Sequence, residues 1–211
     1  AKYGEESSFR YFLNPLFKGC YSEYILAKLA EQGANPEIFP GDMETIATSM
    51  DFIGVNCYSR YIDSADPVLA DVEQRKRVEP EKYTAVNWEI YPQAIYDAVM
   101  TVKNEFSGDL PIFLTENGAA FDDVVTDAKH VHDERRIDYL RLYLSALQRA
   151  IADGADVRGY FLWSLMDNFE WTSGYTKRFG ITYTDYASLE RIKKDSAFWY
   201  QKLIAHNGFE P

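Results

Sequence analysis

Cysteine, basic residues and long apolar runs are all scarce in this 211-residue chain. Two cysteines, Cys20 and Cys57, cannot form a disulfide scaffold, and we expect both to be reduced, buried thiols, as in a cytoplasmic protein of bacterial type. The 22 Lys and Arg against 33 Asp and Glu give a net charge of −11. This balance disfavours nucleic acid and anionic membranes as partners, because both attract a basic surface. No apolar stretch approaches the ~20 residues that span a bilayer.

Several catalytic and cofactor motifs are also absent. There is no GxGxxG or Walker loop for a dinucleotide or nucleotide, and no GxSxG or HExxH. His130 and His132 are two positions apart, a spacing that does not place them on one helix face. The neighbouring Asp127, Asp133 and Glu134 are typical of a solvated helix start. We therefore expect no metal and no cofactor.

Hydrophobic residues make up 46 % of the chain, which is sufficient for one sizeable core. Three short apolar runs lack polar alternation and predict buried parallel strands at 50–56, 110–116 and 157–164. Apolar residues at helical spacing predict helices at 21–32, 92–106, 136–152 and 196–206. The alternation of strands and helices indicates an α/β fold.

Three strands cannot close a barrel, and two exposed parallel edges are unusual in a soluble domain. The sheet is therefore either open or part of a larger structure. The charged, aperiodic segment Val68–Glu81 is interpreted as an exposed loop.

Polar residues cluster where these predicted strands end. Asn56 and Tyr58 follow the first, Glu116 ends the second, and an aromatic segment follows the third. In parallel α/β folds the carboxyl ends of the strands carry the functional site. A carboxylate that emerges from an apolar strand, as Glu116 does, needs compensating partners or a polar cleft. Alternatively, Glu116 only caps the loop at Asn117 and Gly118.

The segment Trp163–Gly180 (WSLMDNFEWTSGYTKRFG) concentrates aromatic rings, carboxylates and amides. Flat aromatic rings pack against the C–H faces of sugars, while carboxylates and amides bind sugar hydroxyls. This mixture favours a carbohydrate cleft over a phosphate site. The alternative is an aromatic-rich core loop without a ligand.

These residues resemble glycoside hydrolase family 1, the β-glucosidase family, over almost the whole chain. The likeness rests on five segments: FLNPLFKG (12–19), DFIGVNCYSR (51–60), NWEIYPQAIY (87–96), FLTENGAA (113–120) and GYFLWSLMDNFEWTSGYTKRFGI (159–181). It implies that residues 1–211 form the C-terminal half of a (β/α)8 TIM barrel, about three parallel strands with flanking helices. It also implies retaining hydrolysis of β-glucosides or short β-linked oligosaccharides, without a cofactor.

The resemblance also assigns roles to individual residues. Glu116 would be the nucleophile and Tyr58 its hydrogen-bonding neighbour. The substrate-binding residues would be Asn56, Trp88, Trp163, Glu170, Trp171 and Phe179. A carboxylate at position 170 argues against substrates that carry a phosphate, since the 6-phosphoglycosidase branch places a small residue there.

Some features depart from the family pattern. Cys20 replaces a common acidic residue and Cys57 a common aromatic one. The Asn-Glu-Pro motif with the acid/base Glu is absent, as is the rest of the N-terminal half. We therefore expect this chain to be inactive or very weak alone, and to pair with the missing half or with itself. A catalytically silent sugar-binding or interaction protein of the same fold is the alternative.

Overall fold

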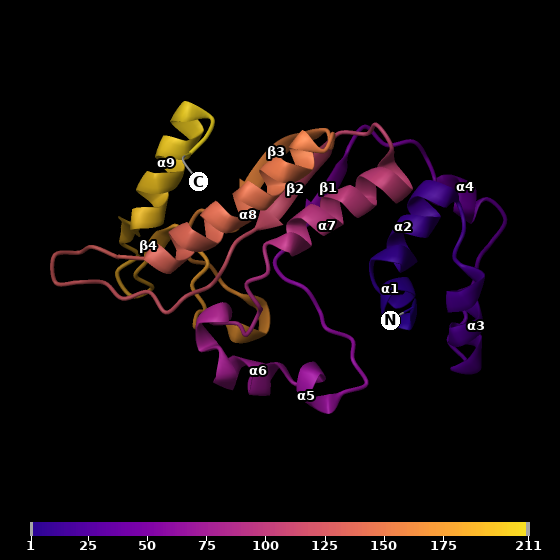
Figure 1. The fold of residues 1–211 in the computed structure, drawn as a ribbon, viewed down its shortest axis with the longest axis horizontal. Coiled ribbons are helices and arrows are strands. Elements are labelled where there is room, and N and C mark those ends of the chain that lie inside the picture. The colour runs from indigo at the N-terminus through magenta and orange to yellow at the C-terminus, as the bar shows by residue number, and fades with distance from the viewer. Residues whose placement is uncertain (1, 210–211) are drawn as a thin grey trace.

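A small parallel sheet forms the centre of the molecule. Among residues 2–209, which the computed structural model describes, β1 (Ile53–Asn56), β2 (Ile112–Asn117) and β3 (Val157–Leu162) form this sheet in that order. The helices α7 (Gln93–Val102) and α8 (Glu134–Ala152) lie along one face of the sheet (Figure 1). The predicted α/β fold, its three parallel strands and these flanking helices are confirmed.

The remaining elements surround this centre. At the N-terminal side lie α1 (Lys2–Ser7), α2 (Phe9–Lys18), α3 (Glu23–Glu31) and α4 (Asp42–Ile46). Between β1 and α7 come α5 (Pro67–Ala70), α6 (Val72–Val78) and the 3-10 turn η1 (Pro80–Lys82). A π-helical turn η2 (Lys103–Ser107) extends α7, and η3 (Trp171–Ser173), the hairpin β4 (Thr182–Thr184) and β5 (Arg191–Lys193), and α9 (Asp195–His206) complete the fold. In Figure 1 the N-terminal helices and α9 lie at opposite ends of the molecule.

The segment Val68–Glu81 is largely exposed as predicted, but it is not a loop, because α5, α6 and η1 together occupy most of it. The Asp71 side chain accepts a hydrogen bond from the Gln74 amide and caps the start of α6. The helix packs little apolar surface, so its sequence shows no apolar periodicity. Besides this cap, Glu73 accepts a hydrogen bond from Asn87 and Arg75 donates one to the Tyr83 hydroxyl, which ties α6 to the segment that follows it.

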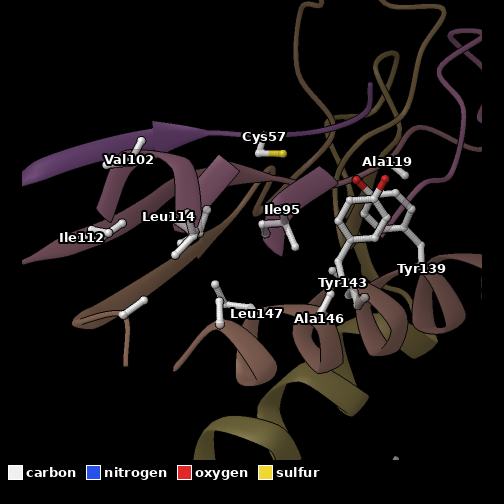
Figure 2. Close-up of a cluster of buried hydrophobic side chains, with 14 of the residues drawn as sticks. Cys57, Ile95, Val102, Ile112, Leu114, Ala119, Tyr139, Tyr143, Ala146 and Leu147 are labelled. Carbon is white, nitrogen blue, oxygen red and sulfur yellow. The ribbon is translucent and has the colours of Figure 1, made fainter. Parts of the chain in front are cut away.

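The hydrophobic core lies between the sheet and helices α7 and α8. Ile112 and Leu114 of β2 point toward the same layer as Ile95 of α7 and Leu147 of α8, and all four are buried (Figure 2). Each such side chain stabilises the fold by roughly 1.5–3 kcal/mol. Cys57 belongs to this core.

The expectation that both cysteines are buried is wrong for Cys20, which is exposed. It follows Gly19, which ends α2 in a left-handed conformation. Cys20 therefore lies in the turn between α2 and α3, where its side chain is not packed into the core. For Cys57, burial raises the pKa of the thiol to about 12, so it is not a thiolate nucleophile at neutral pH.

The opposite face of the sheet is bare within the described part of the chain. Phe113 alternates along β2 with the core residues, and its ring packs edge-on against Phe52 at 5.2 Å. The Phe52 and Phe161 side chains are each more than half exposed. No other strand among residues 2–209 pairs with the outer edges of β1 or β3. None of the helices between residues 2 and 209 is long and apolar enough to cross a membrane.

A buried network of ion pairs ties the segments after the strands to α8 and α9. Arg136 of α8 pairs with Asp123 and Asp133, and Lys194 pairs with Asp123 at 2.5 Å and with Asp167 at 3.0 Å. The network continues from Asp167 to Arg178 at 2.6 Å. Three carboxylates and three cations thus balance, and only Arg178 has appreciable solvent exposure.

Asp133 corrects a third expectation, because it is buried and does not lie in a solvated helix start. Besides the pair with Arg136, its carboxylate accepts hydrogen bonds from the Ser196 amide at 2.8 Å and the Ser196 hydroxyl at 2.5 Å. Asp133 therefore joins the start of α8 to the start of α9.

Replacing Asp133 should destabilise the fold strongly. Asp133→Asn keeps the shape but leaves the Arg136 charge buried with one carboxylate fewer, which typically costs about 3–5 kcal/mol. The free energy of unfolding, measured with urea, should fall by that order. The control is Asp138→Asn on the same helix, whose pair with Arg141 is exposed and should change stability far less. Equal losses in the two variants would contradict this account of the network.

Candidate active site

The carboxyl ends of the three strands bring the predicted site residues to one edge of the sheet. Asn56 at the end of β1 is in register with Glu116 near the end of β2. Asn117, the last residue of β2, is paired with Leu162 at the end of β3. The Trp163 amide, one residue further, donates to the Asn117 carbonyl at 2.9 Å. The structure therefore confirms that the carboxyl ends of the three strands converge.

Glu116 and Tyr58 are in direct contact. The Tyr58 hydroxyl donates a hydrogen bond of 2.6 Å to Glu116 Oε2, and both side chains are half-buried. This bond runs between two neighbouring strands, so Glu116 is more than a cap for its own loop. Tyr58 binds only one of the two carboxylate oxygens of Glu116.

Burial is the main cause of a raised Tyr58 pKa, and the hydrogen bond and charge of Glu116 and the charge of Glu170 add to it. The neutral phenol is therefore the stable form at neutral pH. Tyr58 acts as a fixed hydrogen-bond donor to the carboxylate.

Buried hydrogen bonds behind the site fix the orientation of Tyr58 and of the strand end. The Tyr139 and Tyr143 hydroxyls donate to the Tyr58 carbonyl at 3.1 and 2.8 Å. Their rings stack 4.1 Å apart on α8 and lie side by side in Figure 2. The buried Asn117 side chain donates to the Cys57 carbonyl and accepts from the Tyr160 hydroxyl, both at 2.7 Å.

Asn117, Tyr139, Tyr143 and Tyr160 are positioning residues that sequence reasoning did not select. The only local signal was the position of Asn117 directly after Glu116 in the second apolar run. The three tyrosines lie on elements that read as ordinary core segments. Their hydroxyls reach partners 22 to 85 positions away, which no local pattern reveals.

Three aromatic rings form one wall beside Glu116. Trp88 lies 4.9 Å from the Tyr58 ring and 5.9 Å from the Phe179 ring, measured between centroids. Phe179 also meets Tyr58 edge-on at 6.3 Å. These residues come from three distant segments, so the fold assembles an aromatic surface next to the carboxylate.

Glu170 carries the one buried side-chain oxygen without a hydrogen-bond partner among the described residues, Oε2. An unsatisfied buried polar group costs roughly 1–3 kcal/mol, and more when it is charged. The compensating donor is therefore expected from outside this chain. A ligand hydroxyl is a suitable one.

The other predicted residues have different surroundings. The Asn56 side chain accepts from the Thr115 hydroxyl at 2.7 Å on the open face of the sheet. Trp163 is half-buried, and its carbonyl lies where a side chain on Gly118 would clash, at 1.8 Å from the Cβ position. Trp171 is 81 % exposed, so its ring is not packed against the wall formed by Trp88 and Phe179.

The segment 163–180 is not the aromatic-rich core loop that was the alternative. Phe169, Trp171 and Tyr175 are exposed, and Phe179 is the aromatic side chain of this segment that is fully buried. Asp167 holds the segment in place, because its carboxylate accepts from the Gly180 and Thr184 amides as well as from the ion network. The exposed aromatic side chains thus lie on a loop that Asp167 holds in place.

The comparisons with known proteins agree with this arrangement. The model of glycosyl hydrolase family 1 matches residues 2–209, and the chain belongs to that family. It is 45 % identical over 200 residues to beta-glucosidase A of Thermotoga maritima, covering 94 % of this chain and 44 % of that relative. It is 46 % identical over 198 residues to the 1,4-beta-D-glucan glucohydrolase of Thermotoga neapolitana, covering 93 % and 44 %.

A solved structure also resembles this chain in fold. The beta-glucosidase from Thermotoga maritima in complex with methyl acetic acid-substituted glucoimidazole superimposes with a TM-score of 0.83 at 42 % identity. The match covers 94 % of this chain and 44 % of that one. The three-stranded sheet is accordingly part of a TIM barrel, and the chain spans less than half the length of the relatives it matches.

The raised pKa of Tyr58 predicts a pH dependence of stability. A phenol ordinarily titrates near pH ~10. Since folding raises the Tyr58 pKa, its contribution to stability is complete below that pH and declines as the pH rises toward the folded-state value. Tyr58→Phe should flatten the alkaline fall in the free energy of unfolding. Tyr61→Phe, at a 95 % exposed position, should leave the fall unchanged, and equal flattening would refute the assignment.

Proposed function

We propose that this chain supplies the nucleophile and most of the sugar-binding side chains of a retaining β-glycosidase acting on β-glucosides. The observation that carries the proposal is the Tyr58–Glu116 hydrogen bond at the strand ends, beside an aromatic wall, in a member of glycosyl hydrolase family 1. The relatives named above are a β-glucosidase and a glucan glucohydrolase, which supports an O-glycosidase.

In the proposed reaction, a carboxylate oxygen of Glu116 forms a bond to the anomeric carbon while the bond from that carbon to the leaving oxygen breaks. A second carboxyl group, about 5–5.5 Å away in retaining enzymes, gives its proton to the leaving oxygen. Water then attacks the same carbon, returns a proton to that group and frees Glu116. Tyr58 holds the Glu116 carboxylate in position through both steps.

The sugar contacts follow from the chemistry of the surrounding groups. Glu170 would accept hydrogen bonds from sugar hydroxyls through its unsatisfied oxygen, and Asn56 would bind a hydroxyl near Glu116. Trp163 would form the floor, and Phe179, whose ring is buried against Trp88 and Tyr58 in this chain, would line the pocket as part of that aromatic wall. The exposed Trp171 is free to turn its indole N–H toward a hydroxyl, and Trp88 lies toward the leaving group.

We further propose that residues 1–211 are the C-terminal part of one catalytic barrel, and that the acid/base carboxylate belongs to an N-terminal half. The bare sheet face with Phe52 and Phe161 supports a covering partner, either that half or a second copy of this chain. A cleft of about 1200 Å³ beside β1, lined by Phe9, Phe12 and Val55 among others, offers a place for the neighbouring structure. The expected cytoplasmic location stays a prediction.

A fluorinated substrate tests the nucleophile without needing the acid. The chain, in the form in which it purifies, is incubated with an activated 2-deoxy-2-fluoro-β-glucoside, and its intact mass and peptides are recorded. A single fluoroglucosyl adduct on Glu116 is expected, since the good leaving group needs little protonation. Glu116→Gln is the matched control and should stay unlabelled.

The same spectrum identifies any co-purified half-barrel that completes the pocket. Labelling at a residue other than Glu116 would contradict the proposed role. Sugar binding by the folded chain with no adduct would instead indicate a silent sugar-binding protein.

Glu170 should determine the preference for an unphosphorylated sugar. In the assembled enzyme, Glu170→Ser should lower kcat/KM for an aryl β-glucoside by about 10- to 100-fold, the value of one or two hydrogen bonds to a charged group. It should also raise the relative rate on the 6-phosphorylated substrate, because a carboxylate that repels the dianion is removed. Glu31→Ser, at an exposed helix position, is the control. Unchanged glucoside hydrolysis in Glu170→Ser would refute this role.

A further inference from the structure

Two histidines and one aspartate meet at the junction between the segment after β2 and helix α9. His130 and His132 flank Val131, which forms an isolated antiparallel bridge with Val125. Asp195 is the first residue of α9, and its amide donates to the Val131 carbonyl at 3.1 Å. This backbone bond holds the Asp195 carboxylate within hydrogen-bonding distance of both imidazole rings.

The contacts in this cluster are short and specific. His130 Nε2 lies 2.6 Å from Asp195 Oδ1, and His132 Nδ1 lies 2.8 Å from Asp195 Oδ2. The imidazole rings stack 4.2 Å apart at an angle of 29°, so both present a ring nitrogen to the same carboxylate. The candidate ligand atoms of the three residues lie within 4.8 Å of one another.

The spacing of the two histidines predicted no metal site, because positions two apart do not share a helix face. That argument assumed a helix, but the structure shows that residues 130–132 are not helical. The third residue of the cluster, Asp195, lies 63 positions after His132. In extended backbone, two side chains two positions apart lie on the same side. This is the arrangement that lets both rings reach Asp195.

Two imidazoles and a carboxylate are the ligands that Zn²⁺ and neighbouring divalent transition metals prefer. In the hydrogen-bonded form each ring presents an N–H to the carboxylate. If each ring proton shifts to the opposite nitrogen, the inward nitrogens become lone-pair donors and an ion replaces the two hydrogen bonds. Two further features favour a cation: the net charge of −11 and the pairing of nearby Lys129 with Glu190.

We propose that His130, His132 and Asp195 bind one divalent transition-metal ion of the Zn²⁺ class, with water completing the coordination. The ion would link the segment after β2 to the start of α9. This site is separate from Glu116 and does not depend on the proposed hydrolase function. Its role is structural, because none of its residues contacts the Tyr58–Glu116 pair.

Calorimetric titration of the chain with Zn²⁺ tests the proposal. The chain carries no histidine tag, and Cys20→Ser is made in every variant because that exposed thiol could bind zinc by itself. Binding of one Zn²⁺ per chain is expected, with no measurable binding of Mg²⁺, which prefers oxygen ligands. Zn²⁺ in excess should also raise the melting temperature, because an ion that binds only the folded state stabilises it by mass action.

Substitution of the exposed His132 gives the sharpest comparison. His132→Gln should weaken Zn²⁺ binding by about tenfold or more, and Asp195→Asn should do the same. His206→Gln is the matched control, since His206 is the third histidine of the chain and lies outside the cluster. Absence of saturable Zn²⁺ binding by the folded chain, or an affinity that His132→Gln leaves unchanged, would overturn the proposal.

Discussion

The buried ion network around Arg136 is the constraint on which the positions of the site loops depend. Arg136 and Lys194 are almost completely removed from water, and each is shared between two carboxylates. Such a cluster is tolerated only when every charge is paired and hydrogen-bonded, because an unpaired buried ion costs several kcal/mol. Burial and the charge of Arg136 even hold the pKa of Lys194 below its ordinary value despite its two acidic neighbours. The segments that contribute these residues therefore have little freedom to move separately.

This constraint reaches the candidate active site through Asp167. The Asp167 carboxylate binds Lys194, Arg178 and the amides of Gly180 and Thr184, and so fixes both ends of the loop that carries Glu170 and Trp171. Tyr139 and Tyr143 of α8 hold Tyr58 through its carbonyl oxygen. Asn117 links the end of β2 to the Cys57 carbonyl. Side chains that meet a substrate work best when their supporting groups leave them one orientation. The network and the Asn117 hydrogen bonds together give the site that rigidity.

The sequence predicted those parts of the structure that depend on local pattern. Apolar runs located the three strands, helical spacing located α7 and α8, and the strand-end rule placed Glu116 and Tyr58 at the same edge of the sheet. Their direct contact was implied only by the family resemblance. The sequence could not predict contacts that depend on which distant side chain fills a buried position, such as Asp133 with Ser196 or Asn117 with Tyr160. It also missed α6, whose exposed position requires no apolar face, and the exposure of Cys20, which depends on the turn that follows Gly19. His130 and Asp195 show the same limit, because their approach results from the docking of α9.

Two unsatisfied features within residues 2–209, the bare sheet face and the Glu170 oxygen, have a common physical consequence. Apolar area contributes about 25 cal/mol per Å² when it is removed from water, so covering even a few hundred Å² around Phe52, Phe113 and Phe161 would add several kcal/mol. That amount is comparable with the ~5–15 kcal/mol by which a whole domain is stable. A partner that covers this face would also exclude water from the edge where Glu116 and Glu170 lie, and electrostatic interactions strengthen as the local dielectric falls. If this chain assembles with the proposed N-terminal half, covering the sheet face and strengthening the electrostatic interactions of the two carboxylates would occur in the same step.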